Sequence, residues 1–532
     1  MRTILKNGKI YVEKNNFQEA LLIEDSIIKQ IGKNEDIKAL NSDKIIDLQG
    51  KTVLPGINDS HLHLLGVGAA MSSCNLTSAK SIDDIIQLGE KFIEDNKGLK
   101  VLFGRGWNQD YFITGDKRLI NKYDLDKIST DIPIVFDRIC GHVSVGNSKA
   151  LEMLNINENS RFDGGVIELG DDGKPNGIFS ENAIGLIQSI IPEKNDKDIE
   201  EEFLKAANYA LSVGITSVQP NDVKGSNYNQ IFNIINNIYK NKKTKLRYRY
   251  QFNFQDINDF KEYLKSEYNT ENYDEKFLSK GALKLFKDGS LGARTALMLN
   301  DYKDAKGIKG IEALSDKNLQ DLCDLATANG FTVVTHAIGD GAVESVIRAY
   351  EKTMNGCKNP LRHGIVHCQI TSREQLERIA DLNICVMYQP IFLDYDTKIV
   401  KSRVGEKLTS TSYAFNSLRE LGAPISFGTD SPVEDCNPFP NIYCAVTRMD
   451  LDGNPANGFY PKEKMSVEDA IDAYTYGGAY NEFKENFKGR LKPGYVADLI
   501  VLDKDIFTID EAHIKDIQVE MTMIDGEFVY RR

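Results

Sequence analysis

Two histidines separated by a single residue are the strongest indication of chemistry in this sequence. His61 and His63 stand in the run DSHLH, at the end of an apolar stretch. Side chains two positions apart on a β-strand point to the same face, so both imidazoles can reach one metal ion. The chain has only 7 histidines among 532 residues, so such a spacing seldom arises by chance. The alternative is a pair of exposed or hydrogen-bonded strand histidines.

Three further candidate ligands end apolar runs later in the chain. His336 ends FTVVTH, His367 ends HGIVH and Asp430 ends PISFGTD. Active sites of α/β barrels are built at the carboxyl ends of the strands, so we expect these side chains to meet there. Asp430 alone could equally cap a helix, because Ser431 and Pro432 follow it. As the last member of a series with four histidines, it is better explained by a shared metal site.

Lys284 is the least obvious candidate. In the run ALKLFKD, strand alternation puts Lys284, Phe286 and Asp288 on one face and Lys287 on the other. Burying an ammonium group is costly, so a buried strand lysine is expected to be neutral or paired. A neutral lysine can react with carbon dioxide to give a carbamate, whose two oxygens can bridge two metal ions. An ion pair with Asp288 or another carboxylate is the alternative, and the spacing does not choose between them.

These residues lie in a region where apolar strands alternate with helical patterns. The eight predicted strands span residues 53–63, 215–220, 247–254, 282–288, 331–336, 363–368, 384–389 and 424–430. Helices are predicted between most of them, at 197–213, 315–328, 341–351 and 372–381. Eight strands with intervening helices are typical of a TIM-type (β/α)8 barrel, the α/β fold that we predict.

Both ends of the chain differ from this region. Short β-rich runs joined by Asn, Gly and Asp turns predict a small β-sandwich made of residues 1–55 and 489–532. The barrel domain would then span 56–488. Its first two strands are separated by about 150 residues, far more than one helix needs. We therefore predict an inserted lid subdomain at 70–180.

Composition narrows the class of protein. The chain carries 65 Lys and Arg against 78 Asp and Glu, a net charge of −13, which argues against a nucleic-acid partner. Its one basic cluster, 240–249, is interpreted as a solvated helix end that runs into a strand. No run approaches the roughly 18 apolar residues of a membrane span, and no export signal is evident. The 8 cysteines form no CxxC pair, which favours a reducing cytoplasm. We expect a cytoplasmic protein with a small-molecule substrate and no membrane partner. The sequence does not decide between a monomer and a homodimer.

Five motifs together resemble a known family. They are GINDSHLH, LKLFKDGSLGARTA, THAIGDGA, FGTDSPV and GRLKPGYVADLIVLD. They are similar to motifs of the amidohydrolase superfamily of metal-dependent hydrolases, within its amidohydrolase-3 branch. The resemblance extends to the YtcJ-like proteins related to N-substituted formamide deformylase, and it covers nearly the whole chain. It implies a barrel with a metal site at the strand ends, while the substrate varies within the branch.

The resemblance implies a role for each metal-site residue. His61 and His63 would bind the more buried metal ion, and Asp430 would contact that ion and the nucleophilic water. Lys284 would be carboxylated and would bridge the two ions. His336 and His367 would bind the second ion. One departure stands before His367, where Val366 replaces a glutamate that is common in relatives. Because Val366 should face the opposite side of the strand, we expect ligation by His367 to survive.

Four residues are candidates for substrate binding. Trp107, the only tryptophan, would either wall an apolar pocket or anchor the core of the insertion. His142 resembles a family position that faces the site, where it would hydrogen-bond the substrate carbonyl or oxyanion. Asp288 and Arg294 follow the strand that carries Lys284, and they would either bind a polar substrate end or pair with each other.

The sequence therefore predicts a hydrolase of the C–N bond of an amide, with an N-acyl or N-formyl amine as substrate. A metal-activated hydroxide would attack the carbonyl, with Asp430 as general base and then general acid. One or two divalent ions are expected, with zinc first and manganese or iron also compatible. One alternative is a deaminase or cyclic-amide hydrolase that uses one metal and an uncarboxylated Lys284. A non-catalytic barrel scaffold is another, although it would not need a complete ligand set.

Overall fold

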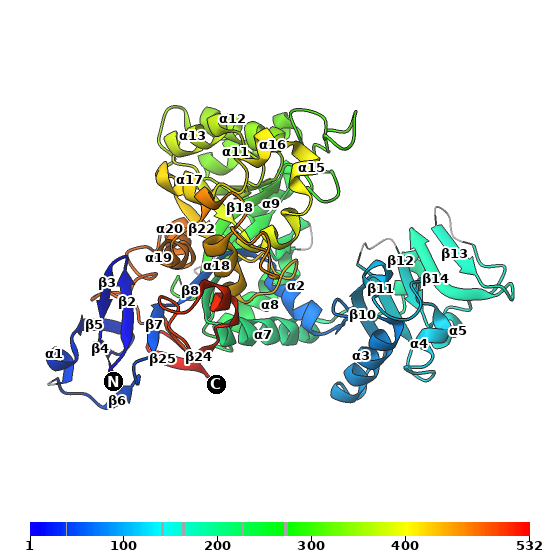
Figure 1. Ribbon diagram of the computed structural model, residues 1–532, viewed down its shortest axis with the longest axis horizontal. Coiled ribbons are helices and arrows are strands. Elements are labelled where there is room, and N and C mark those ends of the chain that lie inside the picture. The colour runs from blue at the N-terminus through cyan, green and yellow to red at the C-terminus, as the bar shows by residue number, and fades with distance from the viewer. Residues whose placement is uncertain (39, 140–142, 162–164, 182, 226–227, 271–274) are drawn as a thin grey trace. The chain divides into compact units, whose positions relative to one another are not determined.

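The structure is a computed structural model of the 532-residue chain (Figure 1). It describes every residue except 39, 140–142, 162–164, 182, 226–227 and 271–274. The described residues form two units. The first comprises Met1–Gly66 and Ala206–Arg532, and the second comprises Val67–Lys205.

A sheet of parallel strands forms the centre of the first unit. Its strands follow the order β8-β15-β17-β18-β19-β20-β21-β22, and each neighbouring pair is parallel. The strands are β8 (Ile57–Leu62), β15 (Ile215–Pro220), β17 (Arg247–Asn253), β18 (Leu278–Phe286), β19 (Val333–Ala337), β20 (Gly364–His367), β21 (Cys385–Tyr388) and β22 (Ile425–Phe427). The two end strands meet, since the Ser60 hydroxyl donates to the Phe427 carbonyl and the Asp430 N–H to the His61 carbonyl. The predicted TIM-type barrel is confirmed.

Helices follow most of these strands and cover the outside of the barrel. They include α8 (Tyr228–Lys240), α9 (Ile257–Lys265), α11 (Asp316–Ala328), α12 (Asp340–Met354), α13 (Arg373–Asp381) and α18 (Pro438–Thr447). Side-chain caps define where they begin: Ser315 accepts from the Asn318 N–H at α11, and Ser372 forms a capping box with Gln375 at α13. Among the described residues, no helix is long and apolar enough to cross a membrane.

Strand β17 shows how alternation sorts side chains in the barrel wall. Tyr248, Tyr250 and Phe252 are buried among aromatic rings that include Phe232 of α8 and Tyr263 of α9. The arginines between them are also buried, and Arg247 forms a two-point ion pair with Asp498. The interpretation of the basic cluster as a solvated helix end that runs into a strand agrees with the structure, since α8 ends at the exposed Lys240 and β17 begins at Arg247. The strand guanidiniums are buried with hydrogen-bond acceptors.

Both termini contribute to two further sheets. One has the order β5-β4-β1-β6 and the other β25-β24-β23-β7-β2-β3. Their strands are β1 (Arg2–Lys6), β2 (Lys9–Glu13), β3 (Asn16–Gln18), β4 (Ala20–Glu24), β5 (Ile27–Gly32), β6 (Lys44–Asp47), β7 (Thr52–Pro55), β23 (Leu499–Leu502), β24 (Val519–Ile524) and β25 (Glu527–Arg531). Strand β7 pairs with the C-terminal strand β23, where Val53 opposes Val501, and in Figure 1 the blue β7 lies near the red β24 and β25 of the same sheet. One apolar core contains residues of both chain ends. The predicted sandwich from both termini is confirmed.

The first predicted barrel strand, 53–63, proves to be two strands. Thr52–Pro55 is β7 of a terminal sheet, and Ile57–Leu62 is β8 of the barrel. Gly56 separates them, and a Cβ at that position would collide with the side chain of Thr216. Every residue of both strands is buried, because each half lies in a different sheet, so the sequence pattern does not reveal the division.

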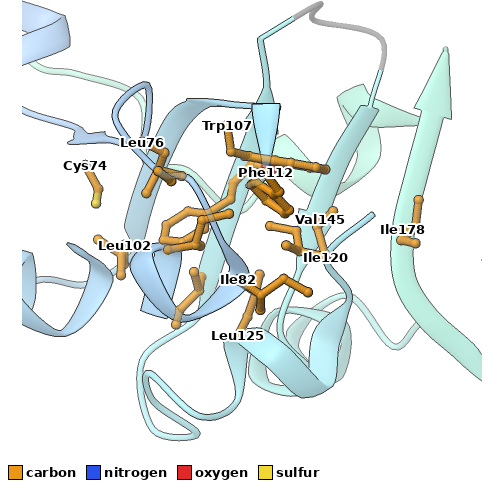
Figure 2. Close-up of a cluster of buried hydrophobic side chains, with 14 residues drawn as sticks. Cys74, Leu76, Ile82, Leu102, Trp107, Phe112, Ile120, Leu125, Val145 and Ile178 are labelled. Atoms are coloured by element: carbon orange, nitrogen blue, oxygen red, sulfur yellow. Dashed lines mark hydrogen bonds between the residues drawn. The ribbon is translucent and has the colours of Figure 1, made fainter. Parts of the chain in front are cut away.

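The second unit has its own sheet and core. Its strands follow the order β13-β14-β12-β11-β10-β9. They are β9 (Cys74–Asn75), β10 (Leu102–Trp107), β11 (Ile134–Arg138), β12 (Val143–Gly146), β13 (Gly165–Leu169) and β14 (Pro175–Glu181), and helix α3 (Ile82–Asp95) packs on them. Figure 2 shows Trp107 and Phe112 among the buried side chains of this unit, and the indole N–H donates to the Phe136 carbonyl. The insertion after the first barrel strand is confirmed as a folded unit.

Replacing Trp107 by alanine should lower the free energy of unfolding of this unit by about 3–5 kcal/mol, because it removes a buried indole and leaves a cavity. Urea unfolding followed by circular dichroism measures the change. Ile113→Ala is the matched control, since Ile113 is exposed in the same unit and should change stability by less than about 0.5 kcal/mol. Equal stability of the two variants would contradict the core position. Emission of the only tryptophan should also be blue-shifted in the native protein.

Candidate metal centre

Six side chains meet where the barrel strands end. His61 lies in β8 and His63 directly after it, while Asp430 follows β22 on the other side of the barrel seam. The remaining three come from consecutive strands: Lys284 of β18, His336 of β19 and His367 of β20. Strand register places Phe286 opposite His336 and Ala337 opposite His367. Because the strands are parallel, their carboxyl ends bring these side chains to one end of the barrel.

The distances define a compact cluster of donor atoms. His61 Nε2 and His63 Nε2 each lie 3.4 Å from Asp430 Oδ1. Ligand atoms of these three residues all lie within 4.8 Å of one another, as required of groups that share one metal ion. The ring of His367 lies 4.4 Å from that of His336 and 5.8 Å from that of His61, measured between centroids. The His336–His367 pair therefore lies directly beside the His61–His63 pair.

Each of the four histidines has one ring nitrogen bound to an oxygen acceptor. The pairs are His61 Nδ1 with Gln251 Oε1, His63 Nδ1 with the Asn221 carbonyl, His336 Nε2 with the Gly289 carbonyl, and His367 Nδ1 with Gln389 Oε1, at 2.7–3.2 Å. A carbonyl oxygen can only accept, so the contacting nitrogen carries the proton. The other nitrogen then keeps its lone pair, which is the form that binds a metal ion.

Electrostatics favours a neutral His61 and a neutral His336 beside an ionised carboxylate. At His63, burial lowers the pKa but Asp430 and Asp222 raise it by more, so that the pKa of His63 lies above its usual value. Burial lowers the pKa of His61 to about 4, and burial together with the Lys284 cation lowers that of His336 to about 3. Burial alone would raise the pKa of Asp430, but its contacts with His61 and His63 lower it well below the usual range. An unprotonated imidazole nitrogen and a carboxylate oxygen that face each other need a proton or a cation between them. The donor set therefore fits a divalent metal ion.

Lys284 is buried and has no ion-pair partner among the described residues. Its Nζ donates weakly to the Leu285 carbonyl at 3.4 Å and lies 3.9 Å from the centre of the Phe286 ring. The predicted alternative, an ion pair with Asp288, is wrong, because no carboxylate of the described residues lies within ion-pair distance of this nitrogen. Burial lowers the pKa of Lys284 to about 7, so a large fraction of the amine is neutral near pH 7.

Asp288 and Arg294 have separate partners. The Asp288 carboxylate accepts three backbone N–H groups, from Leu297, Ile338 and Gly339, and lies 3.4 Å from His336 Nε2. Burial raises its pKa to about 7 although these hydrogen bonds lower it. The half-buried Arg294 pairs with Asp304. The two residues do not pair with each other, and Asp288 holds the loop after β18 against the end of β19.

The other predicted residues fall outside this cluster. Trp107 is fully buried in the core of the second unit, which favours the anchor over the pocket wall. His142 lies outside the described residues. His363, a further histidine of the chain, accepts the Val333 N–H at its Nδ1 and stacks on Tyr350, so it supports the barrel wall. His513 is exposed and pairs with Asp516.

Two contributions to the centre were not predicted from the sequence. Gln251 and Gln389 are the side-chain acceptors of His61 and His367. The sequence of β17, RYRYQFN, contains a signal for the first of them. Alternation puts Gln251 on the face opposite the aromatic side chains, which is the face of the barrel interior. The second contribution is backbone geometry: His367 and Asp430 have left-handed φ angles of 77° and 56°. Such conformations are uncommon for residues other than glycine and turn each side chain at the end of its strand.

A sequence model of the amidohydrolase family matches residues 44–530. This span includes the whole cluster and almost the entire chain. The chain belongs to the amidohydrolase family. The match confirms the resemblance drawn from the five motifs. The chain is therefore a member of a family of metal-dependent hydrolases, and a structurally similar protein is described as one.

Three relatives show how far the similarity extends. YtcJ of Bacillus subtilis (strain 168), which is named as an amidohydrolase, is 31% identical over 541 residues and 100% of both chains. The N-substituted formamide deformylase of Arthrobacter pascens is 24% identical over 98% of this chain and 96% of that protein. The crystal structure of an uncharacterized metal-dependent hydrolase from Pyrococcus horikoshii OT3 is 28% identical with a TM-score of 0.78. The similarity covers 96% of this chain and 99% of the Pyrococcus protein.

Proposed function

We propose that this amidohydrolase cleaves the C–N bond of an amide, and that its substrate is an N-acyl or N-formyl amine. The observation that carries the proposal is the convergence of His61 Nε2, His63 Nε2 and Asp430 Oδ1 at one end of the barrel. The described cluster contains no serine hydroxyl or cysteine thiol that contacts these three groups, so water is the expected nucleophile. Similarity to a protein named N-substituted formamide deformylase supports the choice of substrate class.

In this proposal the six residues hold two divalent ions, with zinc the expected metal. His61, His63 and Asp430 hold one ion, and His336 and His367 hold the other. The neutral Lys284 amine could add to carbon dioxide with release of one proton, and the carbamate so formed would give this position a negative charge and two oxygen donors for the metal site. When bound by these residues, divalent ions would supply a metal-activated water and polarisation of the substrate carbonyl.

Asp430 is the proposed proton carrier. Its carboxylate accepts a proton from the attacking water and then delivers it to the departing nitrogen, which leaves as an amine. The left-handed backbone at Asp430 and the bond from its N–H to the His61 carbonyl hold the carboxylate over the site. The predicted contact of His142 with the substrate oxygen stays part of this proposal.

A second candidate uses one metal ion. Only His61, His63 and Asp430 form a group of three close donors among the described residues, and Lys284 Nζ already has the Leu285 carbonyl and the Phe286 ring as contacts. In that case Lys284 stays unmodified and the reaction is that of a deaminase or a cyclic-amide hydrolase.

Metal content and amine release test the proposal together. Protein purified with added zinc should hold two ions per chain, lose activity when a chelator removes them and regain it when zinc is restored. A panel of N-formyl and N-acyl amines, assayed for released amine, should contain substrates of the zinc-loaded protein. One ion per chain with activity only on cyclic amides or aminated rings would favour the second candidate. A zinc-supplemented preparation that binds no divalent metal would refute both.

A further inference from the structure

Two buried glutamines each contact one histidine of the metal centre. Gln251 lies in β17, and its Oε1 is 2.9 Å from His61 Nδ1. Gln389 follows β21, and its Oε1 is 2.7 Å from His367 Nδ1. Both glutamine side chains are buried. Thus one glutamine serves the His61–His63 pair and the other serves the His336–His367 pair.

The orientation of each amide is determined by its other end. Gln251 Nε2 donates to the Ser60 carbonyl at 3.1 Å, and Gln389 Nε2 donates to the Met387 carbonyl at 3.0 Å. Because a backbone carbonyl accepts only, the amide nitrogen must face it and the amide oxygen must face the histidine. Nδ1 of His61 and of His367 then carries the proton, and Nε2 of each ring is left as the metal donor.

The remaining two histidines are held differently. His63 Nδ1 contacts the Asn221 carbonyl and His336 Nε2 contacts the Gly289 carbonyl. These backbone acceptors persist whatever side chain occupies the position. Each half of the centre therefore contains one histidine oriented by the main chain and one oriented by a replaceable side chain.

We propose that Gln251 and Gln389 are positioning residues that set the metal affinity of the two halves separately. Gln251 acts on the half formed by His61, His63 and Asp430, and Gln389 acts on the half formed by His336 and His367. The inference rests on the metal site proposed above. Loss of an acceptor that holds a ligating histidine typically weakens metal binding by about 10- to 100-fold.

The test compares Gln251→Met and Gln389→Met with the wild type, since methionine keeps the length of the side chain and removes the acceptor. Zinc bound per chain is measured by elemental analysis after equilibration at buffered free zinc concentrations. Each variant should lose one of two ions at a free zinc concentration about 10- to 100-fold higher than the wild type does, and keep the other. In ¹⁵N spectra of histidine-labelled protein, Gln251→Met should change the Nδ1–H signal of His61, and Gln389→Met that of His367.

Two further variants complete the test. Gln219→Met removes a buried glutamine on β15 that bonds to the Gly478 carbonyl, and it should leave both zinc affinities unchanged. Gln251→Glu and Gln389→Glu keep the oxygen acceptor, and in the protonated form their O–H can donate to the Ser60 or Met387 carbonyl, so these variants should bind zinc more tightly than the methionine variants and keep the test open if a methionine variant fails to fold. Unchanged zinc affinity in the methionine variants, or equal loss of both ions in each, would overturn the inference alone. Absence of zinc from the wild type would instead overturn the proposed function.

Discussion

Replacing Asp430 with asparagine is expected to reduce turnover by about 10²- to 10⁴-fold while zinc stays bound. Asparagine has the same shape, so its carbonyl oxygen can occupy the place of Oδ1, 3.4 Å from His61 Nε2 and His63 Nε2. It cannot accept a proton from water and pass it to a leaving nitrogen. Amine release gives the rate, and elemental analysis gives the metal content of the same preparation.

Asp435→Asn is the matched control for this experiment. Asp435 is an exposed aspartate five positions later, and its carboxylate bonds to the Tyr209 hydroxyl and the Asn437 N–H. It should retain activity within about twofold, as expected for an exposed position. If Asp430→Asn also retained activity, Asp430 would have no role in proton transfer. If that variant lost zinc together with activity, the residue would act chiefly as a ligand.

Replacing Lys284 with alanine is expected to lower turnover by about a thousandfold and to release one of two zinc ions. In the proposed two-ion centre a carbamate on Lys284 would supply ligands to the metal site, and polarisation of the substrate by an ion is expected to contribute several kcal/mol to the rate. Because Lys284 is fully buried, alanine leaves a cavity beside His336 and Phe286. Acetate or formate can enter that cavity and supply two oxygens, so either should restore part of the activity and the second ion.

Lys284→Met separates the bridge from a packing role. Methionine fills the same space without a nitrogen, so this variant should be inactive and should not respond to acetate. The native mass of the wild type should also exceed its sequence mass by one carbon dioxide, which acid removes. Wild-type turnover and two ions in Lys284→Met would refute the bridge. An unmodified lysine with one bound ion would favour the one-metal candidate.

The agreement between predicted and observed barrel strands has a local cause. Strand β18 was predicted at 282–288 and spans Leu278–Phe286, since it begins where Leu278 pairs with Tyr248. Strand β20 was predicted at 363–368 and spans Gly364–His367, because His367 and Cys368 turn into left-handed backbone. Hydrophobic alternation places a strand, whereas its ends depend on pairing and on backbone conformations that the pattern does not contain.

For the candidate site, too, part could be predicted from the sequence and part depends on tertiary contacts. The sequence by itself determined the fold class, and it pointed to His61, His63, His336, His367 and Asp430, because scarce ligand types at strand ends form a pattern that is visible along the chain. The tertiary structure decided which oxygen each histidine contacts, and so which ring nitrogen faces the centre. It also decided that Asp288 binds backbone N–H groups and that Trp107 is a core residue. Those contacts join residues far apart in the chain, and they exist only after the strands have become neighbours.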